Sequence, residues 1–410
     1  MLTGNIGLPE YQRSFVWSLR DILRLIKSLK EGDFVQPITI ARNNGGDSTN
    51  YKNLILDGQQ RLTAILLYKL QIMPNASGRE SELNAQEELD DEESAETERI
   101  PIDWTFEEIV AKYNEGISFQ NLEELSKALC KNNRYYQIDD ISYDDDFYKK
   151  TYLGFSYIVP EKGNAEKIQR GFTQLFRYMN YYGTHLSAME SRRSLYYMNM
   201  GLKDYFDGKD NGKDVLCDIR INENYKSGKI DFIRYLAILS EYYALNKESK
   251  ETPQRDILKG YSAYSSRESY YADYVSHLLK LNQEANIHKF DGFVFESAFP
   301  HSVWRERYKV LRESVSRLKE YMNFDKKNKV LSFNSWIDAD YWLFGLVYHI
   351  VFMGKTLKDD IIQLSDEVND HIYKIKKDET LDSYKKAPNR LGYIRDRVSK
   401  SLTIYRKYVH

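Results

Sequence analysis

Cysteine and proline are scarce in this chain of 410 residues, which contains two cysteines and eight prolines. Cys130 and Cys217 lie far apart in the sequence, and neither has a second cysteine at the spacing of metal ligands. We therefore expect two buried, unreactive thiols in a reducing cytoplasm, and neither a disulfide framework nor a cysteine-bound metal. The small number of prolines argues against a long disordered stalk.

Long apolar runs are also missing. The most apolar segment, residues 341–354, is shorter than the ~20 residues that a membrane-spanning helix needs. Residues 1–10 contain neither the basic start nor the apolar core of a secretory signal peptide. The sequence therefore predicts a cytoplasmic protein that does not enter a membrane.

A strong excess of charge of one sign is the third absence, since the formal net charge is −2. A nucleic-acid binder with this composition needs a local basic surface instead of a basic chain. Tyrosine, by contrast, is abundant, with 34 residues. Its amphipathic ring suits cores, interfaces and stacking surfaces.

The length predicts at least two domains. We expect an α+β chain, with a small mixed domain at 1–205 followed by a large, mostly α-helical domain at 206–410 that binds DNA or a partner. An acidic insertion is expected near 76–100, because residues 80–98 contain ten acidic and no basic side chains and would repel a phosphate backbone. Within the second half, "KSGK" at 226–229 predicts a break between helices.

Short strands and helices alternate in the first half. Alternating aromatic residues predict a strand at 8–17, and Ser18 with Asp21 predicts a capped helix start. Gly32 is expected to end that helix. Further expected elements are a hairpin of strands at 36–41 and 53–56, a helix at 59–72, a strand at 152–159 that rejoins the sheet, and a helix at 187–205.

The stretch "LILDGQQRLTAILL", residues 54–67, places five polar or small residues between a strand-like and a helix-like segment. A helix start presents unpaired N–H groups and partial positive charge, which makes it a natural anion site. Gly58 permits close approach of a ligand, Arg61 can bind a phosphate, and Asp57 can hold Mg²⁺. Gln59 and Gln60 can orient a water molecule or read a base edge.

A capped turn explains the same residues without a ligand. Asp57 as N-cap, with Gln60 three positions later, is close to a capping box. Arg61 speaks against this interpretation, because a cation in the first helical turn costs ~0.3–1 kcal/mol that a bound anion would reverse. The local residues alone leave the turn and the site open.

Three motifs in order resemble the N-terminal domain of GmrSD-type modification-dependent restriction systems. The first is "LPEYQRSFVW" at 8–17, the second is "LILDGQQRLTA" at 54–64, and the third is "FRYMNYYGTHLSAMESRRSLY" at 176–196. The third matches the family in Phe176, Asn180, Gly183, Thr184, Leu186, Ser187, Glu190 and Arg193.

This resemblance implies a core similar to the ParB/sulfiredoxin fold, in which such a glycine junction binds a nucleotide. It further implies nucleoside-triphosphate hydrolysis and the sensing of modified or phage DNA. Residues 57–61 would form the phosphate pocket, with Asp57, Gln59, Gln60 and Arg61 as catalytic groups. The remaining nucleotide contacts would be Gln12, Arg13, Gly58 and Thr63.

Complete restriction enzymes of this type carry a second, HNH-like nuclease domain with a histidine in a ββα-metal motif. None of the histidines beyond the first half has a nearby asparagine in a suitable arrangement. We therefore expect no nuclease in this chain and a separate nuclease subunit as partner. These histidines are His277, His288, His301, His349, His371 and His410.

Basic residues gather near the C-terminus and are interleaved with tyrosines such as Tyr373, Tyr384 and Tyr393. Lysine and arginine would give salt-sensitive contacts to phosphates, and tyrosine can stack on exposed bases. A solvated helix face is the other interpretation, and the sequence leaves both open. The predicted DNA contacts are Lys374, Lys376, Lys377, Arg395 and Arg397.

Three functions follow from these patterns. In the first, the chain is a nucleoside triphosphatase that senses DNA, in which Arg61 stabilises transition-state charge and Gln59 or Gln60 positions the water. In the second, nucleotide or DNA binds without hydrolysis and regulates a partner nuclease. The third, direct cleavage of nucleic acid, has least support, because no carboxylate cluster with metal-ligand spacing is evident. A homo-oligomer is compatible with each.

Overall fold

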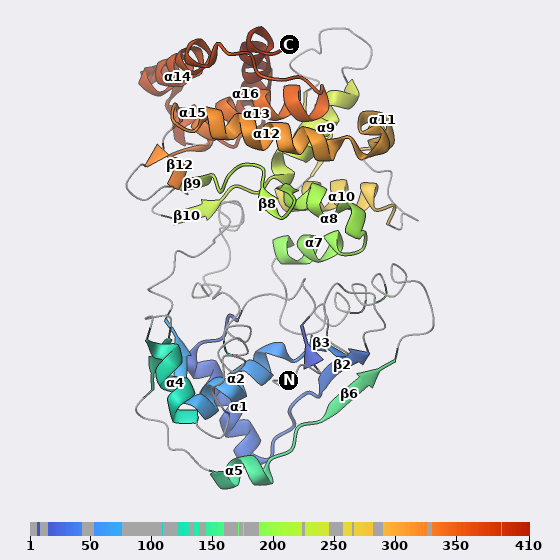
Figure 1. The fold of residues 1–410 in the computed structure, drawn as a ribbon, viewed down its shortest axis with the longest axis vertical. Helices are drawn as coiled ribbons and strands as arrows, with labels where there is room; N and C mark the ends of the chain where they lie inside the picture. Colours follow the sequence, from blue (N-terminus) through green and yellow to red (C-terminus); the bar gives the residue numbers. More distant parts are fainter. Residues whose placement is uncertain are drawn as a thin grey trace. The chain divides into compact units, whose positions relative to one another are not determined.

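The computed structural model describes residues 6–8, 15–42, 53–75, 109, 122–131, 135–138, 145–159, 171, 175, 188–223, 226–245, 257–264, 266–281, 290–322, 324–325, 330–386 and 388–410. The chain divides into two compact units (Figure 1). Unit 1 comprises Met1–Glu82 and Ser94–Met198, and unit 2 contains Asn199–His410. The division thus precedes helix α8 (Met200–Asp207), whereas we placed the domain boundary after Tyr205, inside that helix.

Unit 1 contains a four-stranded sheet with the strand order β1-β3-β2-β6. The predicted hairpin is confirmed, because β2 and β3 are antiparallel neighbours. The predicted return of residues 152–159 to this sheet is also confirmed, since β6 pairs with β2 in parallel. The strands are β1 (Ile6–Gly7), β2 (Ile38–Arg42), β3 (Asn53–Asp57) and β6 (Phe155–Ile158).

The sheet residues alternate between two faces, as the geometry of a strand requires. Ile38, Ile40 and Ile55 pack on one face together with Leu62 of the following helix. Ala41, Leu54 and Leu56 form a separate apolar cluster. This packing places the end of β3 and the start of the next helix beside the start of β2.

Helices α1 (Leu19–Glu31) and α2 (Gln59–Leu70) pack together in unit 1 (Figure 1). The capping box of Ser18 and Asp21 is present, and Gly32 ends α1 with φ = 76°, as predicted. Between the helices lies an apolar core that includes the fully buried Phe15. Its buried members from the two helices and the segment before them are Phe15, Ile22, Leu25, Ile26, Ala64, Leu67, Tyr68 and Leu70.

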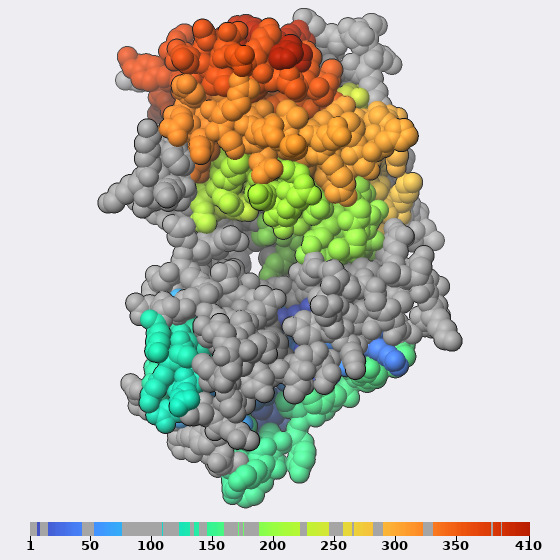
Figure 2. All heavy atoms as spheres, in the orientation of Figure 1, coloured from blue at the N-terminus to red at the C-terminus, as the bar shows by residue number. Residues whose placement is uncertain are grey.

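The remaining elements of unit 1 are small. A two-stranded sheet pairs β4 (Ile72–Pro74) with β5 (Tyr135–Gln137). Helices α4 (Leu122–Cys130), α5 (Asp145–Lys150) and α7 (Ala188–Tyr196) complete the described part. Figure 2 shows α5 and β6 at the surface, where the side chains of Tyr152, Phe155 and Tyr157 are exposed.

Unit 2 is mostly helical. Its longer helices are α8 (Met200–Asp207), α9 (Ile233–Leu245), α10 (Arg267–Leu278), α12 (Trp304–Leu318), α13 (Trp336–Val347), α14 (Ile361–Lys377) and α16 (Leu391–Tyr405). Its short helical segments are η5 (Tyr261–Ala263), α11 (Phe295–Ala298), η6 (Pro300–Ser302), the π-helical η7 (Tyr348–Phe352), η8 (Glu379–Leu381), α15 (Asp382–Lys386) and η9 (Arg406–Tyr408).

A second four-stranded sheet lies in unit 2, with the order β10-β9-β12-β11. The predicted break between helices at "KSGK" is confirmed, and its residues form β10, which pairs with β9. The strands are β9 (Arg220–Glu223), β10 (Lys226–Lys229), β11 (Phe324–Asp325) and β12 (Val330–Phe333). A small hairpin joins β7 (Lys209–Asp210) to β8 (Lys213–Asp214).

The predicted continuous helix at 187–205 is interrupted. Helix α7 ends at Tyr196, and α8 begins after Asn199, whose side chain caps it by accepting a hydrogen bond from the N–H of Gly201. Within the described residues, no helix is both long enough and apolar enough to cross a lipid bilayer. The apolar segment at 341–354 instead contributes α13 and η7, whose residues are almost all buried in unit 2.

Candidate functional site

A single residue, Gly58, joins β3 to α2 at the centre of the "DGQQR" stretch. Its backbone has φ = 91°, in the left-handed region that residues with a Cβ rarely adopt. A Cβ here would overlap Cδ1 of Ile38 and would lie 3.0 Å from Nη2 of Arg61. The turn therefore requires glycine for two reasons, its backbone conformation and its close packing on β2.

The capped-turn interpretation of this stretch is wrong. The N-cap of α2 is Gly58, which makes no side-chain capping hydrogen bond, while Asp57 is the last residue of β3. Gln60 uses its amide for another contact: its Oε1 accepts a hydrogen bond from the backbone N–H of Val16 at 3.0 Å. The start of α2 thus retains the partial positive charge of a helix N-terminus without a capping side chain.

Arg61 lies over the same junction, with 15% of its side chain exposed. Its Nη2 donates to Oδ2 of Asp57 at 2.6 Å and approaches the carbonyl oxygen of Pro37 at 3.4 Å. Its Nη1 reaches Oε1 of Gln36 at 3.4 Å, and its buried Nε has no hydrogen-bond partner among the described residues. The Asp57 carboxylate offsets the placement of a cation in the first helical turn.

Two further predicted site residues are buried beside the junction. Gln59 is almost fully buried, and Thr63 is fully buried. In the part of the chain that the structure describes, the hydroxyl of Thr63 has no hydrogen-bond partner. Thr63 therefore lies one helical turn inside α2, and its hydroxyl does not face solvent.

Asp57 is the carboxylate that the junction offers to a metal, and 30% of its side chain is exposed. Across the described ranges, no three His, Cys, Asp or Glu side chains are grouped closely enough to hold a metal ion. A single carboxylate fits Mg²⁺ when phosphates of a nucleotide supply further ligands, because Mg²⁺ commonly binds in this way. Asp57 is thus the residue that would hold a Mg²⁺ ion bound together with a nucleotide at this junction.

Other predicted features lie outside the described residues. These are the proposed site residues Gln12 and Arg13, the acidic insertion at 80–98, and residues 176–187 of the third motif. The end of the third motif is described, and α7 carries Glu190 and Arg193. The structure therefore brings together residues 57–61 with Val16, Gln36 and Pro37, three positions to which we assigned no role.

The three lysines predicted to contact DNA lie in the last turn of α14. Nζ of Lys376 is 2.5 Å from Oδ2 of Asp338, and Nζ of Lys374 is 3.6 Å from Oδ2 of Asp370. Lys377 lies over the exposed ring of Tyr373, 5.4 Å from its centroid. Lys374 and Lys377 therefore remain accessible to a phosphate, whereas Lys376 is held by a carboxylate of α13.

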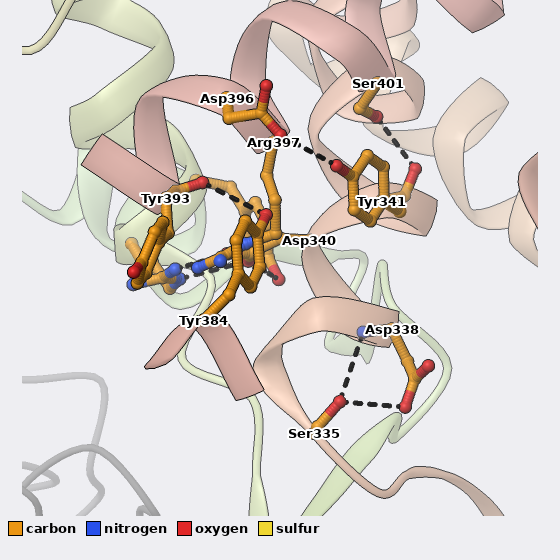
Figure 3. Close-up of polar contacts among 11 residues, drawn as sticks. Ser335, Asp338, Asp340, Tyr341, Tyr384, Tyr393, Asp396, Arg397 and Ser401 are labelled. Carbon is orange, nitrogen blue, oxygen red and sulfur yellow. Dashed lines mark hydrogen bonds and ion pairs between the residues drawn. The ribbon is translucent and has the colours of Figure 1, made fainter. Parts of the chain in front are cut away.

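The two arginines predicted to contact DNA have structural roles. Arg397 is fully buried, and its Nε donates to Oδ2 of Asp340 at 2.8 Å. Figure 3 shows its side chain directed toward Asp340 and the ring of Tyr384. The prediction of Arg397 as a DNA contact is wrong, because no phosphate can reach a fully buried guanidinium. Nε of Arg395 donates to the carbonyl oxygen of Ile257, which fixes that side chain as well.

Comparison with known proteins identifies the first part of the chain. A family model for the N-terminal domain of GmrSD restriction endonucleases matches residues 2–197. An uncharacterized protein of Methanocaldococcus jannaschii is 31% identical over 186 residues, which is 39% of this chain and 30% of that relative. The chain thus spans less than a third of the relative's length. No solved structure matches this chain. Residues 2–197 therefore form a domain of the GmrSD restriction endonuclease N-terminal domain family.

Proposed function

We propose that unit 1 binds and hydrolyses a nucleoside triphosphate at the Gly58 junction. In this proposal the chain is the DNA-sensing component of a modification-dependent restriction or phage-defence system. Membership of residues 2–197 in the GmrSD family supports the restriction-related role. A core similar to the ParB/sulfiredoxin fold is part of the same proposal.

The observation that carries the proposal is the left-handed Gly58 in front of a helix without a side-chain cap. Such a turn lets phosphate oxygens approach the helix start closely, where the helix dipole favours negative charge. Arg61 adds a guanidinium at the same place, and Asp57 adds the carboxylate for Mg²⁺. The phosphates, the Arg61 guanidinium and the positive end of α2 would then lie together within one helical turn.

The ion pair of Asp57 and Arg61 gives each residue a role in this proposal. Arg61 would exchange the carboxylate for a phosphate and stabilise charge that develops in the transition state. Mg²⁺, when bound, would neutralise phosphate charge. Gln59 or Gln60 would orient the attacking water. Gln12 and Arg13 remain proposed contacts of the nucleotide, whereas Thr63 does not, because its side chain is fully buried.

DNA is the proposed target, and a separate nuclease subunit is the proposed partner. A cytoplasmic location fits this role. The accessible lysines Lys374 and Lys377 at the end of α14 are the proposed phosphate contacts of unit 2.

Binding without hydrolysis is the second candidate, in which the chain is a regulatory module that controls a partner nuclease. One observation favours it. Both Nη atoms of Arg61 already have acceptors in Asp57, Gln36 and Pro37, so the guanidinium serves to hold the junction together. A residue in that role supports binding but need not accelerate a reaction.

Phosphate release from ATP, GTP and CTP separates the two candidates. We expect wild-type protein to release phosphate from one of them in the presence of Mg²⁺, and Arg61→Ala to lose about 10²–10³-fold in kcat, as for removal of a charge-stabilising donor. Arg24→Ala, an exposed arginine on α1, is the matched control. Nucleotide binding without phosphate release supports the regulatory module. No binding of any nucleotide refutes the triphosphatase and leaves DNA as the ligand of the regulatory module.

A further inference from the structure

Gln60 connects two parts of unit 1 that are distant in sequence. Its side chain is 8% exposed, and its Oε1 accepts a hydrogen bond from the backbone N–H of Val16, 44 residues away, at 3.0 Å. A partly buried backbone N–H needs an acceptor, because leaving it without one costs free energy. The amide oxygen of Gln60 is therefore committed to the backbone at Val16.

Apolar packing holds the same short segment in place. Phe15 is fully buried in the core between α1 and α2, where it belongs to one cluster with Ala64 and Leu67. Trp17, which follows Val16, also packs against that cluster. Residues 15–17 are thus attached to the apolar core by two side chains and to α2 by one hydrogen bond, which depends on Gln60.

Arg61, the next residue, makes the corresponding contact on a different segment. Its guanidinium reaches Gln36 and Pro37, which lead into β2. Gln60 and Arg61 therefore attach two separate chain segments to the first turn of α2. The second segment continues into Ile38, against which Gly58 leaves no room for a Cβ.

We infer that Gln60 is a positioning residue, which holds residues 15–17 against the first turn of α2 and so shapes the nucleotide site without touching the attacking water. The inference rests on the proposed function of the Gly58 junction. It replaces the role of water-orienting group, for which Gln60 was a candidate. A side chain that uses its oxygen on the protein backbone contributes by keeping the binding geometry formed before the ligand arrives.

Two substitutions separate positioning from contact with water. Gln60→Met keeps nearly the same volume and removes the acceptor, whereas Gln60→Glu restores an acceptor oxygen but no amide donor. Hydrogen exchange at the Val16 amide is measured first, with the Ile22 amide, which donates to the carbonyl oxygen of Ser18 at 3.1 Å, as internal reference. Binding and turnover of ATP, GTP and CTP with Mg²⁺ are measured second. Gln137→Met, on exposed β5, is the control for the chemical change.

In Gln60→Met we expect exchange at Val16 to accelerate by about tenfold, the effect of losing one hydrogen bond, while Ile22 is unchanged. KM for the nucleotide should rise and kcat should stay close to the wild-type value, because the bound geometry can still form. Gln60→Glu should recover both the protection of Val16 and the nucleotide affinity.

Unchanged exchange at Val16 in Gln60→Met would overturn the inference. So would a Gln60→Glu variant that protects Val16 fully but loses turnover, because that result places the amide group at the reacting water. A wild-type protein that binds no nucleotide contradicts the proposed function instead, and exchange at Val16 still decides whether Gln60 positions residues 15–17.

Discussion

His349 lies in η7 with 5% of its surface exposed, and its Nε2 is 3.0 Å from the carbonyl oxygen of Leu402. Burial lowers the pKa of His349 from its ordinary value of 6.5 to about 4. The contact with Leu402 opposes this shift, and the charges of Lys355 and Arg406 add to it. The imidazole is therefore neutral in the folded protein at neutral pH.

This depressed pKa predicts a loss of stability in mild acid. Between pH 6.5 and 4 the unfolded chain binds a proton at His349 that the folded chain does not bind, so the free energy of unfolding falls as the pH falls. The full loss is about 3 kcal/mol at pH 4 and does not grow below it. Denaturant unfolding at several pH values measures this loss.

The matched variant for this measurement is His349→Gln, which does not titrate in that range. It should be less stable at pH 7 and should lack the His349 contribution to the slope. If the free energy of unfolding depends on pH equally in both proteins between pH 6.5 and 4, the folded protein binds the His349 proton over the same pH range as the unfolded chain, and its pKa is not lowered.

Among the elements, α13 and α16 pack together, and Gly345 permits their close approach. The N–H of Gly345 donates to Oγ of Ser401 at 2.8 Å, and that hydroxyl donates to the carbonyl oxygen of Tyr341 at 2.8 Å. The hydroxyl of Tyr405 donates to the carbonyl oxygen of Trp342 at 2.8 Å. Side chains of α16 therefore replace the missing side chain of glycine and bind the backbone of α13.

A Cβ at Gly345 would lie 2.5 Å from the carbonyl oxygen of Ser401 and would overlap the ring of Tyr405. We therefore expect Gly345→Ala to destabilise unit 2 by about 1–3 kcal/mol, the cost of overpacking a core. Gly392→Ala, on α16 with no heavy atom within 4 Å of its Cβ, is the control and should change stability by less than about 1 kcal/mol. Urea unfolding compares the two variants. Equal midpoints for Gly345→Ala and Gly392→Ala would show that α13 and α16 accommodate the additional methyl group without loss of stability.

Asp340 strengthens the same group of helices from inside. Its carboxylate accepts hydrogen bonds from Arg234 of α9 at 2.6 Å and from Arg397 of α16 at 2.8 Å, and all three side chains are fully buried. One carboxylate thus ties α9, α13 and α16 together. A substitution that removes the Asp340 carboxylate would leave two buried guanidinium groups without their counter-charge, which destabilises the folded protein.

In the whole molecule, the family match covers residues 2–197, and the residues that follow, Asn199–His410, belong to unit 2. The proposed DNA contacts lie in unit 2, and the structure reduces them from five residues to the accessible Lys374 and Lys377. Since Lys376 is paired with Asp338, reversing its charge would disturb the fold as well as any DNA contact.

We expect the double variant Lys374→Glu, Lys377→Glu to weaken binding of duplex DNA and to reduce the slope of log K against log salt by about 2, one for each lost phosphate contact. Fluorescence anisotropy at several salt concentrations measures both quantities. The control pair is Lys27→Glu with Lys127→Glu, two exposed lysines of unit 1. Identical salt slopes for the wild type and the α14 variant would exclude this surface as a DNA contact.

Local features of unit 1 could be predicted from the sequence because they depend on neighbouring residues. The capping box at Ser18, the end of α1 at Gly32 and the hairpin of β2 and β3 were predicted in this way. The strand at "KSGK", where we predicted only a break between helices, has the opposite cause. This strand is stabilised by pairing with β9, which in turn pairs with β12 through contacts such as Ile221 with Phe333.

The family of residues 2–197 and the position of the Gly58 junction could be predicted from the residue order, since motifs and turn residues follow one another along the chain. The contacts of the junction's side chains depend on the packed fold. It paired Gln60 with Val16, paired Arg61 with Asp57 and the segment before β2, and buried Arg397 beside Asp340. The physical reason is that a hydrogen bond or a buried ion pair depends on which surfaces pack together, and packing joins residues that no local periodicity relates.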